Sequence, residues 1–289
     1  MSILPLSKEP QPDEAEFNAW FPSKFSLSQF TSPKSDLSGT DYPKPYTGNR
    51  RILVIGTDER YLEMDNGKLF STGNHPVETL LPMYHLHKAG FEFDIATVSG
   101  NPVKFEFWAM PKEDEAITGL HLTYLQQFQN PLNLREVVEN LGPDSDYVAV
   151  FIPGGHGPLA GLPFSDEVDA VLRWAFANDR HIISICHGPG AFLACAQDGD
   201  DRDFPFKGYS IVAFPDATDR QTPDIGYMPG HLTWRFGEKL KALGVTLLNT
   251  EPTGAVHADR KLLTGDSPFA GNALGKLAAE TLLAEVGAA

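Results

Sequence analysis

The chain has 289 residues, of which 42% are hydrophobic and 21% charged, a composition typical of a globular protein with one large core domain. Its net charge of −15 argues against a nucleic-acid-binding surface, because no basic field attracts phosphates. No apolar run approaches the roughly 18 residues of a membrane helix, and the first residues lack the pattern of a signal peptide. The two cysteines, Cys186 and Cys195, form no disulfide framework, so we expect a reducing, cytoplasmic location.

Residues 1–48 show no periodic element and are rich in Pro, Ser, Asp and Lys. The aromatic residues scattered through them indicate an N-terminal arm that packs on the core domain or on a second subunit, rather than a free tail. We expect the core domain to span residues 49–289.

Strands and helices alternate along most of this core domain. Strands are expected at residues 51–57, 91–98, 147–152, 181–185, 209–214, 245–249 and 261–264, and helices at 77–89, 165–178, 190–196, 233–242 and 268–286. The alternation predicts an α/β fold with a mostly parallel sheet covered by helices on both faces. Residues 100–143 interrupt it, with an extended stretch at 104–110 and helices at 113–128 and 134–141, and are interpreted as a small inserted subdomain.

One stretch carries the pattern of a nucleophile elbow. The apolar strand at 181–185 runs directly into Cys186, His187 and the Gly-Pro-Gly sequence of 188–190, and a helix follows. A thiol at the N-terminus of a helix is shifted toward the thiolate, which is the form that attacks carbonyl carbons. The alternative is that Cys186 is a small hydrophobic core residue.

Two further groups of residues favour the catalytic interpretation. The Pro-Gly-Gly-His-Gly loop at 153–157 follows a strand, so N–H groups near Gly154, Gly155 and His187 can form an oxyanion hole, although a plain structural turn is the alternative. His187 is placed to act as a general base for the thiol. Asp216 or Asp219 can orient its imidazole, or either can simply cap a turn.

Glu78 is a second candidate acid or base, in the first turn of the helix at 77–89. In a semi-buried pocket its pKa would rise, so that it could share a proton with the thiol. Alternatively it only complements the helix dipole. His85, His87 and Glu92 suggest the start of a zinc site, but two histidines two positions apart face different directions, so at most one joins Glu92.

Several motifs together resemble one known family, the heat-shock-protein-31 chaperones. These are glutathione-independent glyoxalase III enzymes within the class I glutamine-amidotransferase-like superfamily. The resemblance covers nearly the whole chain, including the arm. It is carried by residues 58–61, 65–76, 153–157, 186–189, 226–234 and 263–268.

The resemblance implies a flavodoxin-like sandwich with a small extra domain, a homodimer, and conversion of methylglyoxal, a small dicarbonyl, to lactate without an added cofactor. It also implies deglycation of early glycated amines and holdase activity toward unfolding proteins. By position, Cys186 matches the nucleophile, His187 its neighbour, Asp219 the triad acid and Glu78 the acidic partner of the thiol.

The same resemblance implies a metal site, for which zinc is the candidate ion. His87 and Glu92 match two of its three ligands. The third position reads Tyr124, with His121 one helical turn earlier, which departs from the family pattern.

Two other functions use the same features. A cysteine amidase or peptidase of this fold would need the same thiol, base and oxyanion hole. A chaperone with a secondary catalytic site would explain the aromatic arm, because exposed apolar surface binds unfolded chains.

Overall fold

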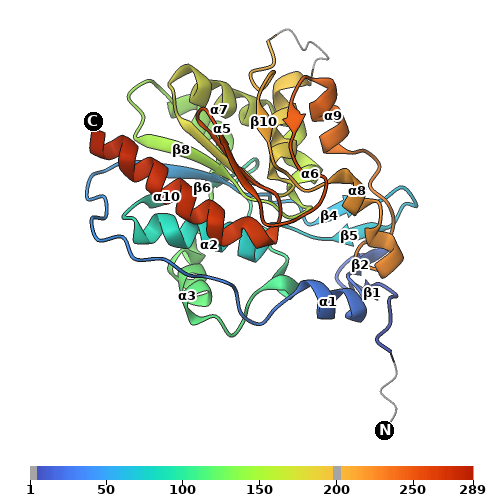
Figure 1. Cartoon of the computed structure of the whole chain (residues 1–289). Helices are drawn as coiled ribbons and strands as arrows, with labels where there is room; N and C mark the ends of the chain where they lie inside the picture. Colours follow the sequence, from blue (N-terminus) through green and yellow to red (C-terminus); the bar gives the residue numbers. More distant parts are fainter. Residues whose placement is uncertain (1–4, 198–202, 289) are drawn as a thin grey trace.

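A central sheet organises the molecule, which is described by a computed structural model over residues 5–197 and 203–288 (Figure 1). In these residues the sheet has seven strands in the order β12-β13-β9-β8-β3-β6-β7. The strands are β3 (Arg51–Ile55), β6 (Glu92–Thr97), β7 (Leu132–Asn133), β8 (Tyr147–Ile152), β9 (His181–Ile185), β12 (Val256–Asp259) and β13 (Leu262–Gly265). All neighbours pair in parallel except β12 and β13. The predicted mostly parallel sheet is confirmed.

Helices cover both faces of this sheet and bury two apolar clusters against it. On one face α2 (Pro76–Lys88) packs along α10 (Gly271–Ala288), with α3 (Glu115–Thr123) beside α2 (Figure 1). On the other face lie α5 (Leu134–Asn140), α7 (Asp166–Ala177) and α9 (Phe236–Ala242). The central strands are mostly apolar, and both of their faces are buried, as in other parallel sheets covered by helices. The three-layer sandwich agrees with the predicted fold.

Local signals in the sequence explain where the main helices begin and end. Ser165 caps α7, since its hydroxyl accepts a hydrogen bond of 3.2 Å from the N–H of Val168. Pro76 occupies the first position of α2, where its missing N–H costs nothing. The chain leaves α2 at Gly90, whose φ of +94° suits glycine.

The N-terminal arm packs on its own chain. Its strands β1 (Gln11–Pro12) and β2 (Ala19–Phe21) join β4 (Tyr61–Glu63) and β5 (Leu69–Ser71) in a second sheet of order β1-β2-β5-β4. The helix α1 (Lys24–Phe30) follows, and the Ser26 hydroxyl donates a 2.6 Å hydrogen bond to the carbonyl of Ile225. Strands β1, β2, β4 and β5 were not predicted, although the Asp-Asn-Gly sequence at 65–67 is a turn signal.

The predicted strands at 209–214 and 245–249 are shorter than expected, and the extended stretch at 104–110 forms a single bridge. In the 209–214 segment only β10 (Ser210–Ile211) is a strand, and it pairs with β11 (Thr246–Leu247) outside the central sheet. The rest is held by single bonds instead of a ladder; for example, Val212 N–H donates to the Thr264 hydroxyl at 3.1 Å. In the 104–110 segment one bridge joins Phe105 to Asn74, and a 3₁₀ turn follows.

The 100–143 range contains α3, α4 (Leu125–Gln129) and α5. Its last part is not separate from the central sheet, because β7 pairs with β6 at the sheet edge. The chain from β7 therefore returns to the α/β layers before residue 143. Among the described helices, none combines the length and the apolar character needed to cross a bilayer.

Candidate active site

Cys186 occupies a strained turn at the carboxyl end of β9. Its φ is +60°, in the left-handed region that non-glycine residues seldom adopt. Such backbone strain persists only where surrounding contacts hold it, and here the Cys186 N–H donates to the carbonyl of Gly265 at 2.9 Å. A 3₁₀ helix, Gly188–Ala196, follows at once. The strand, turn and helix have the order and the strained geometry of a nucleophile elbow.

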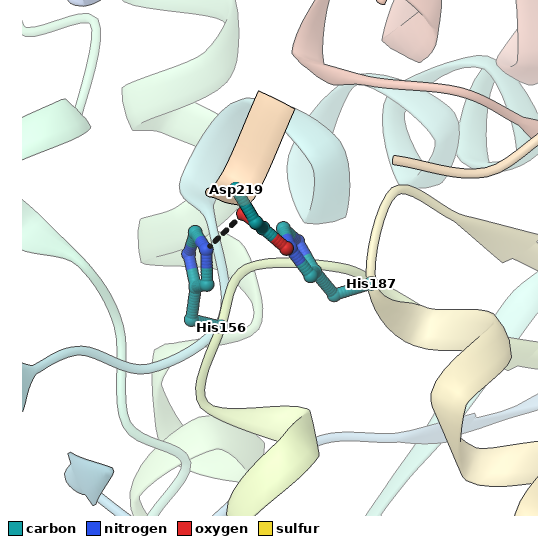
Figure 2. Close-up of side chains that lie close together, drawn as sticks. All are labelled: His156, His187 and Asp219. Carbon is teal, nitrogen blue, oxygen red and sulfur yellow. Dashed lines mark hydrogen bonds and ion pairs between the residues drawn. The ribbon is translucent and has the colours of Figure 1, made fainter. Parts of the chain in front are cut away.

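The thiol, an imidazole and a carboxylate form a continuous line. Cys186 Sγ lies 3.2 Å from Nδ1 of His187, and His187 Nε2 lies 2.8 Å from Oδ2 of Asp219. His156 also contacts Asp219, with Nε2 3.0 Å from Oδ1, so that each carboxylate oxygen pairs with one imidazole (Figure 2). The two imidazole rings lie against each other, with centroids 3.9 Å apart. With the Nε2 proton donated to Asp219, Nδ1 of His187 is free to accept the thiol proton.

The structure distinguishes between the two candidate aspartates. Asp219 is buried at the end of α8 (Asp216–Asp219) and contacts His187. Asp216 instead accepts hydrogen bonds from the N–H groups of Gly237 and Glu238 in α9, at 3.1 and 2.7 Å. Asp216 therefore stabilises the start of a helix, and Asp219 is the one that orients the imidazole.

Asp219 is ionised despite its burial. Burial opposes ionisation, but the neighbouring His187 and His156 outweigh it and hold the pKa of this carboxyl well below its usual range. The ring of His187 also stacks on Phe214, with centroids 4.7 Å apart, which limits its rotation. The acid and the base are thus fixed in one orientation.

Glu78 lies in the first turn of α2 and is fully buried. Neither of its carboxyl oxygens has a partner in normal hydrogen-bond geometry, and its polar neighbours are the Cys186 thiol and the N–H of Gly155. Burial raises the pKa of Glu78 to about 8. At neutral pH it is therefore a neutral acid able to donate a proton. A glutamate that only complemented the dipole of α2 would not need to be buried in this way.

The pKa of the Cys186 thiol differs from the expectation. Burial first, and then the adjacent Glu78 carboxyl, raise the pKa of the Cys186 thiol well above its ordinary value. The predicted shift toward thiolate is wrong for this buried thiol, because the cost of desolvating an anion exceeds the stabilisation from the short helix that follows. The thiol needs a base at the moment of attack, and His187 is within reach.

The glycine loop that follows β8 borders the thiol and the Glu78 carboxyl. A Cβ placed on Gly154 would come within 2.1 Å of Glu78 Oε2 and 2.7 Å of Cys186 Cβ, so only glycine fits there. Gly155 has a φ of +95°, and its N–H stabilises the ionised forms of both Cys186 and Glu78. This N–H is therefore placed to bind an oxyanion formed at the thiol.

Sequence reasoning missed three residues of the site: His156 and Glu106, which are buried, and Tyr227, which is partly buried. His156 could have been selected by its position in the glycine loop, and Tyr227 by its place in the 226–234 stretch that carries the family resemblance. Glu106 had no such signal. Tyr227 packs on His156 with ring centroids 5.8 Å apart, and Glu106 accepts a 2.6 Å hydrogen bond from the Thr72 hydroxyl.

The residues at the expected zinc site do not fit a zinc ion. Nδ1 of His87 is hydrogen-bonded to the Tyr124 hydroxyl at 3.0 Å, and Glu92 forms an ion pair of 2.8 Å with Arg51. The pKa of Tyr124 is raised to about 12, mainly because the residue is buried, so its phenol is a poor zinc ligand at neutral pH. His121 packs among phenylalanines, stacked on Phe128 with centroids 5.5 Å apart.

A second set of potential ligand atoms lies in the line described above. Three potential ligand atoms lie within 4.8 Å of one another, one each from His156, His187 and Asp219. Each of these atoms already takes part in a hydrogen bond to, or from, Asp219 (Figure 2). We interpret the set as a hydrogen-bonded network that orients His187, because a metal would have to displace both bonds.

The fold and this cysteine elbow define the class of the protein. Residues 69–203 match the DJ-1/PfpI family, and the chain belongs to that family. Within it, the chain is 64% identical over 278 residues to the protein/nucleic acid deglycase HchA of Escherichia coli K12 and O157:H7. The alignments cover 96% of this chain and 97% of each relative.

Solved structures agree with the fold. The 24 kDa rapid encystment protein of Francisella tularensis superposes with a TM-score of 0.65 at 18% identity, over 81% of this chain and 99% of that one. Glyoxalase III from Candida albicans superposes with a TM-score of 0.59 at 21% identity, over 80% and 97%.

Proposed function

We propose that this chain is a cysteine-dependent deglycase that also converts methylglyoxal to lactate without glutathione or any other cofactor. The observation that carries the proposal is the strained Cys186, with its sulfur 3.2 Å from His187 Nδ1 and the neutral acid Glu78 beside it. Identity of 64% to relatives named protein/nucleic acid deglycase supports it.

The residues suggest an order of proton transfers. His187 takes the thiol proton as the sulfur adds to the aldehyde carbon, and the protonated Glu78 supplies a proton to the developing alkoxide near the Gly155 N–H. The Glu78 carboxylate then removes the hydrogen from the hemithioacetal carbon while the His187 imidazolium protonates the adjacent ketone oxygen, giving an enediol. Glu78 returns its proton to the adjacent carbon as His187 takes the proton from the hydroxyl of the former aldehyde carbon. The result is a lactoyl thioester, and addition of water releases lactate and the free thiol. The sum is methylglyoxal plus water giving lactate.

Deglycation reaches the same hemithioacetal. In the hemiaminal formed by an amine and methylglyoxal, the C–N bond breaks as the Cys186 thiolate forms the C–S bond, and Glu78 donates a proton to the departing nitrogen, so the amine is restored and lactate is again the product. We propose glycated proteins as substrates, and glycated nucleic acids by analogy with the relatives' name. The expected absence of a nucleic-acid-binding surface restricts this to brief contacts, because a net charge of −15 opposes a stable complex with a polyanion.

The closed site favours a small carbonyl over a folded peptide chain. The exposed fractions of Cys186, His187 and Glu78 are 3%, 1% and 0%. A cavity of about 370 Å³ lies elsewhere, at the amino ends of β3 and β8, lined by residues such as Arg51 and Tyr147. A two- or three-carbon aldehyde needs less rearrangement to reach the sulfur than an extended peptide.

The test follows ¹³C-labelled methylglyoxal by NMR in the absence of glutathione, with and without a chelator. We expect labelled lactate at equal rates in both samples, and none with the Cys186→Ala variant. A fluorogenic peptide panel is run in parallel. Peptide cleavage without lactate formation would instead support the amidase or peptidase.

We further propose a cytoplasmic homodimer that retains holdase activity. Both cysteines are free and buried, as expected in a reducing compartment. Phe17, Phe164 and Phe269 are 88%, 60% and 64% exposed and offer apolar surface for a second subunit or an unfolding chain. Sedimentation velocity reports the oligomer, and suppression of aggregation by the Cys186→Ala variant reports a chaperone activity independent of catalysis.

A further inference from the structure

A second buried carboxyl group, that of Glu106, lies behind the Cys186–His187–Asp219 line. Glu106 is 1% exposed and follows the bridge that joins Phe105 to Asn74. Its Oε1 accepts the 2.6 Å hydrogen bond from Thr72, whereas Oε2 is buried without a partner. Burying a carboxyl group that is only half satisfied is costly, so its position calls for a reason.

That reason lies in the glycine loop. The backbone N–H of His156 is directed at the Glu106 carboxylate, and the His156 ring also lies near this carboxylate. Burial lowers the pKa of the His156 ring, so the ring is neutral at neutral pH. The same ring is bonded to Asp219, and the preceding residue, Gly155, presents its N–H to the thiol. Glu106 therefore contacts the segment that carries both an oxyanion donor and the second imidazole.

Other titratable groups also face Glu106. They are Glu78 from α2, Tyr227 from the segment after the 3₁₀ turn at Thr222–Ile225, and His156 itself. Burial keeps Glu78 neutral at neutral pH, Tyr227 is neutral there as an ordinary phenol, and Asp219 keeps its negative charge next to His156. The charge of Glu106 therefore acts on the backbone N–H of His156 and also raises the pKa of Glu78.

We propose that Glu106 is a positioning residue for the reaction of Cys186: it holds the Gly155–His156 segment so that the Gly155 N–H faces the sulfur and the His156 ring stays on Asp219. This inference deepens the proposed function and rests on it. Glu106 itself does not touch the thiol. It acts through the backbone and the ring of His156.

The proposal has a pH signature that a purely structural residue would lack. Burial raises the pKa of Glu106 to about 7. Below that pH the carboxyl is neutral, and glutamine in its place is nearly isosteric and equally uncharged. Above it, only the wild-type residue carries the negative charge that attracts the backbone N–H of His156. The defect of a Glu106→Gln variant should therefore grow as the pH rises through about 7.

The experiment compares wild type, Glu106→Gln and Thr72→Val with the control Glu285→Gln. The control also removes a carboxylate that contacts a histidine, since Glu285 Oε2 lies 2.5 Å from Nε2 of His181, but it lies far from Cys186 in the fold. At pH 8.5 we expect Glu106→Gln to lower kcat for methylglyoxal by about 10-fold or more with little change in KM. At pH 5.5 the loss should be less than about 3-fold. Thr72→Val should show a smaller loss of the same kind, and Glu285→Gln none.

A second readout does not depend on turnover. The ¹⁵N chemical shifts of His156, and the pH profile of Cys186 alkylation by iodoacetamide, should change in Glu106→Gln and not in Glu285→Gln. If wild type makes no lactate, the proposed function fails, and these two readouts still test Glu106. If Glu106→Gln does not fold, Thr72→Val carries the test. A folded Glu106→Gln with wild-type kcat at pH 8.5, unchanged ¹⁵N shifts and an unchanged alkylation profile would overturn the proposal.

Discussion

The carboxyl group of Glu78 lies beside the thiol of Cys186, and neither side chain is exposed by more than 3%. Burial raises the pKa of both groups, so at neutral pH the pair retains its protons until a substrate arrives. The nucleophile is thus not a resting thiolate. It is an acid–thiol pair that needs His187 to remove a proton and an incoming carbonyl to accept one.

The Glu78→Gln variant tests this pair through both activity and stability. Glutamine cannot exchange the proton, so we expect lactate formation to fall by about 100-fold or more. Because the folded pKa of about 8 lies above the ordinary value of 4.5, the contribution of Glu78 to stability is fully present below pH 4.5 and is lost as the pH rises toward 8.

The variant should remove that part of the pH dependence. Relative to wild type, its free energy of unfolding should rise between pH 5 and pH 8 by on the order of a few kcal/mol, since each pKa unit corresponds to about 1.4 kcal/mol. Urea titrations at both pH values measure it. A variant that is less stable than wild type by the same amount at both pH values would contradict a buried carboxyl with a raised pKa.

The two cysteines should respond differently to alanine. We expect Cys186→Ala to reduce lactate formation below about 1% of wild type while the fold is kept, because no other thiol reaches His187. Cys195 lies in the apolar cluster beneath the elbow, so Cys195→Ala should keep activity and cost about 1 kcal/mol of stability through the cavity it leaves. NMR of lactate and urea unfolding separate the two effects. Activity lost equally in both variants would show that the loss comes from the fold.

The two aspartates of α8 form a matched pair. Asp219→Asn should lower kcat by about 100-fold or more, because an amide can bind His187 in the wrong tautomer and carries no charge. Asp216→Asn should leave kcat within about 2-fold and cost on the order of 1 kcal/mol, through weaker bonds to the N–H groups of α9. Steady-state kinetics and thermal unfolding distinguish them, and the reverse pattern would exchange the roles assigned here.

A fourth prediction concerns zinc binding at His87. We expect wild type to bind no zinc at His87 at micromolar concentration, because Tyr124 occupies Nδ1 and Arg51 holds Glu92. Tyr124→His should gain zinc affinity by replacing a protonated phenol with an imidazole. Isothermal titration with zinc after chelator treatment measures both proteins, with His87→Ala in the Tyr124→His background as the control. Tight binding to wild type that disappears with His87→Ala would show that Tyr124 or Glu92 rearranges.

Local patterns determined the layers of this protein and the place of its nucleophile. The apolar runs of β3, β8 and β9 can only be buried strands, and the glycines around Cys186 and at Gly154 signal tight turns at the carboxyl ends of such strands. The thiol, the following histidine and the glycine loop were therefore visible from order along the chain alone, and so were the start of α7 at Ser165 and the end of α2 at Gly90.

Only the tertiary structure decided what these groups do. Whether Asp216 or Asp219 meets His187 depends on how α8 lies against α9, and the ionisation of Cys186 depends on how many groups exclude water from it. Glu106 and Tyr227 come from segments far from the elbow in sequence; no local pattern marks Glu106, and the 226–234 motif that contains Tyr227 does not indicate that its ring meets His156. Burial and charge proximity are properties of distant segments brought together, so a pKa or a hydrogen-bond partner cannot be predicted from spacing along one segment.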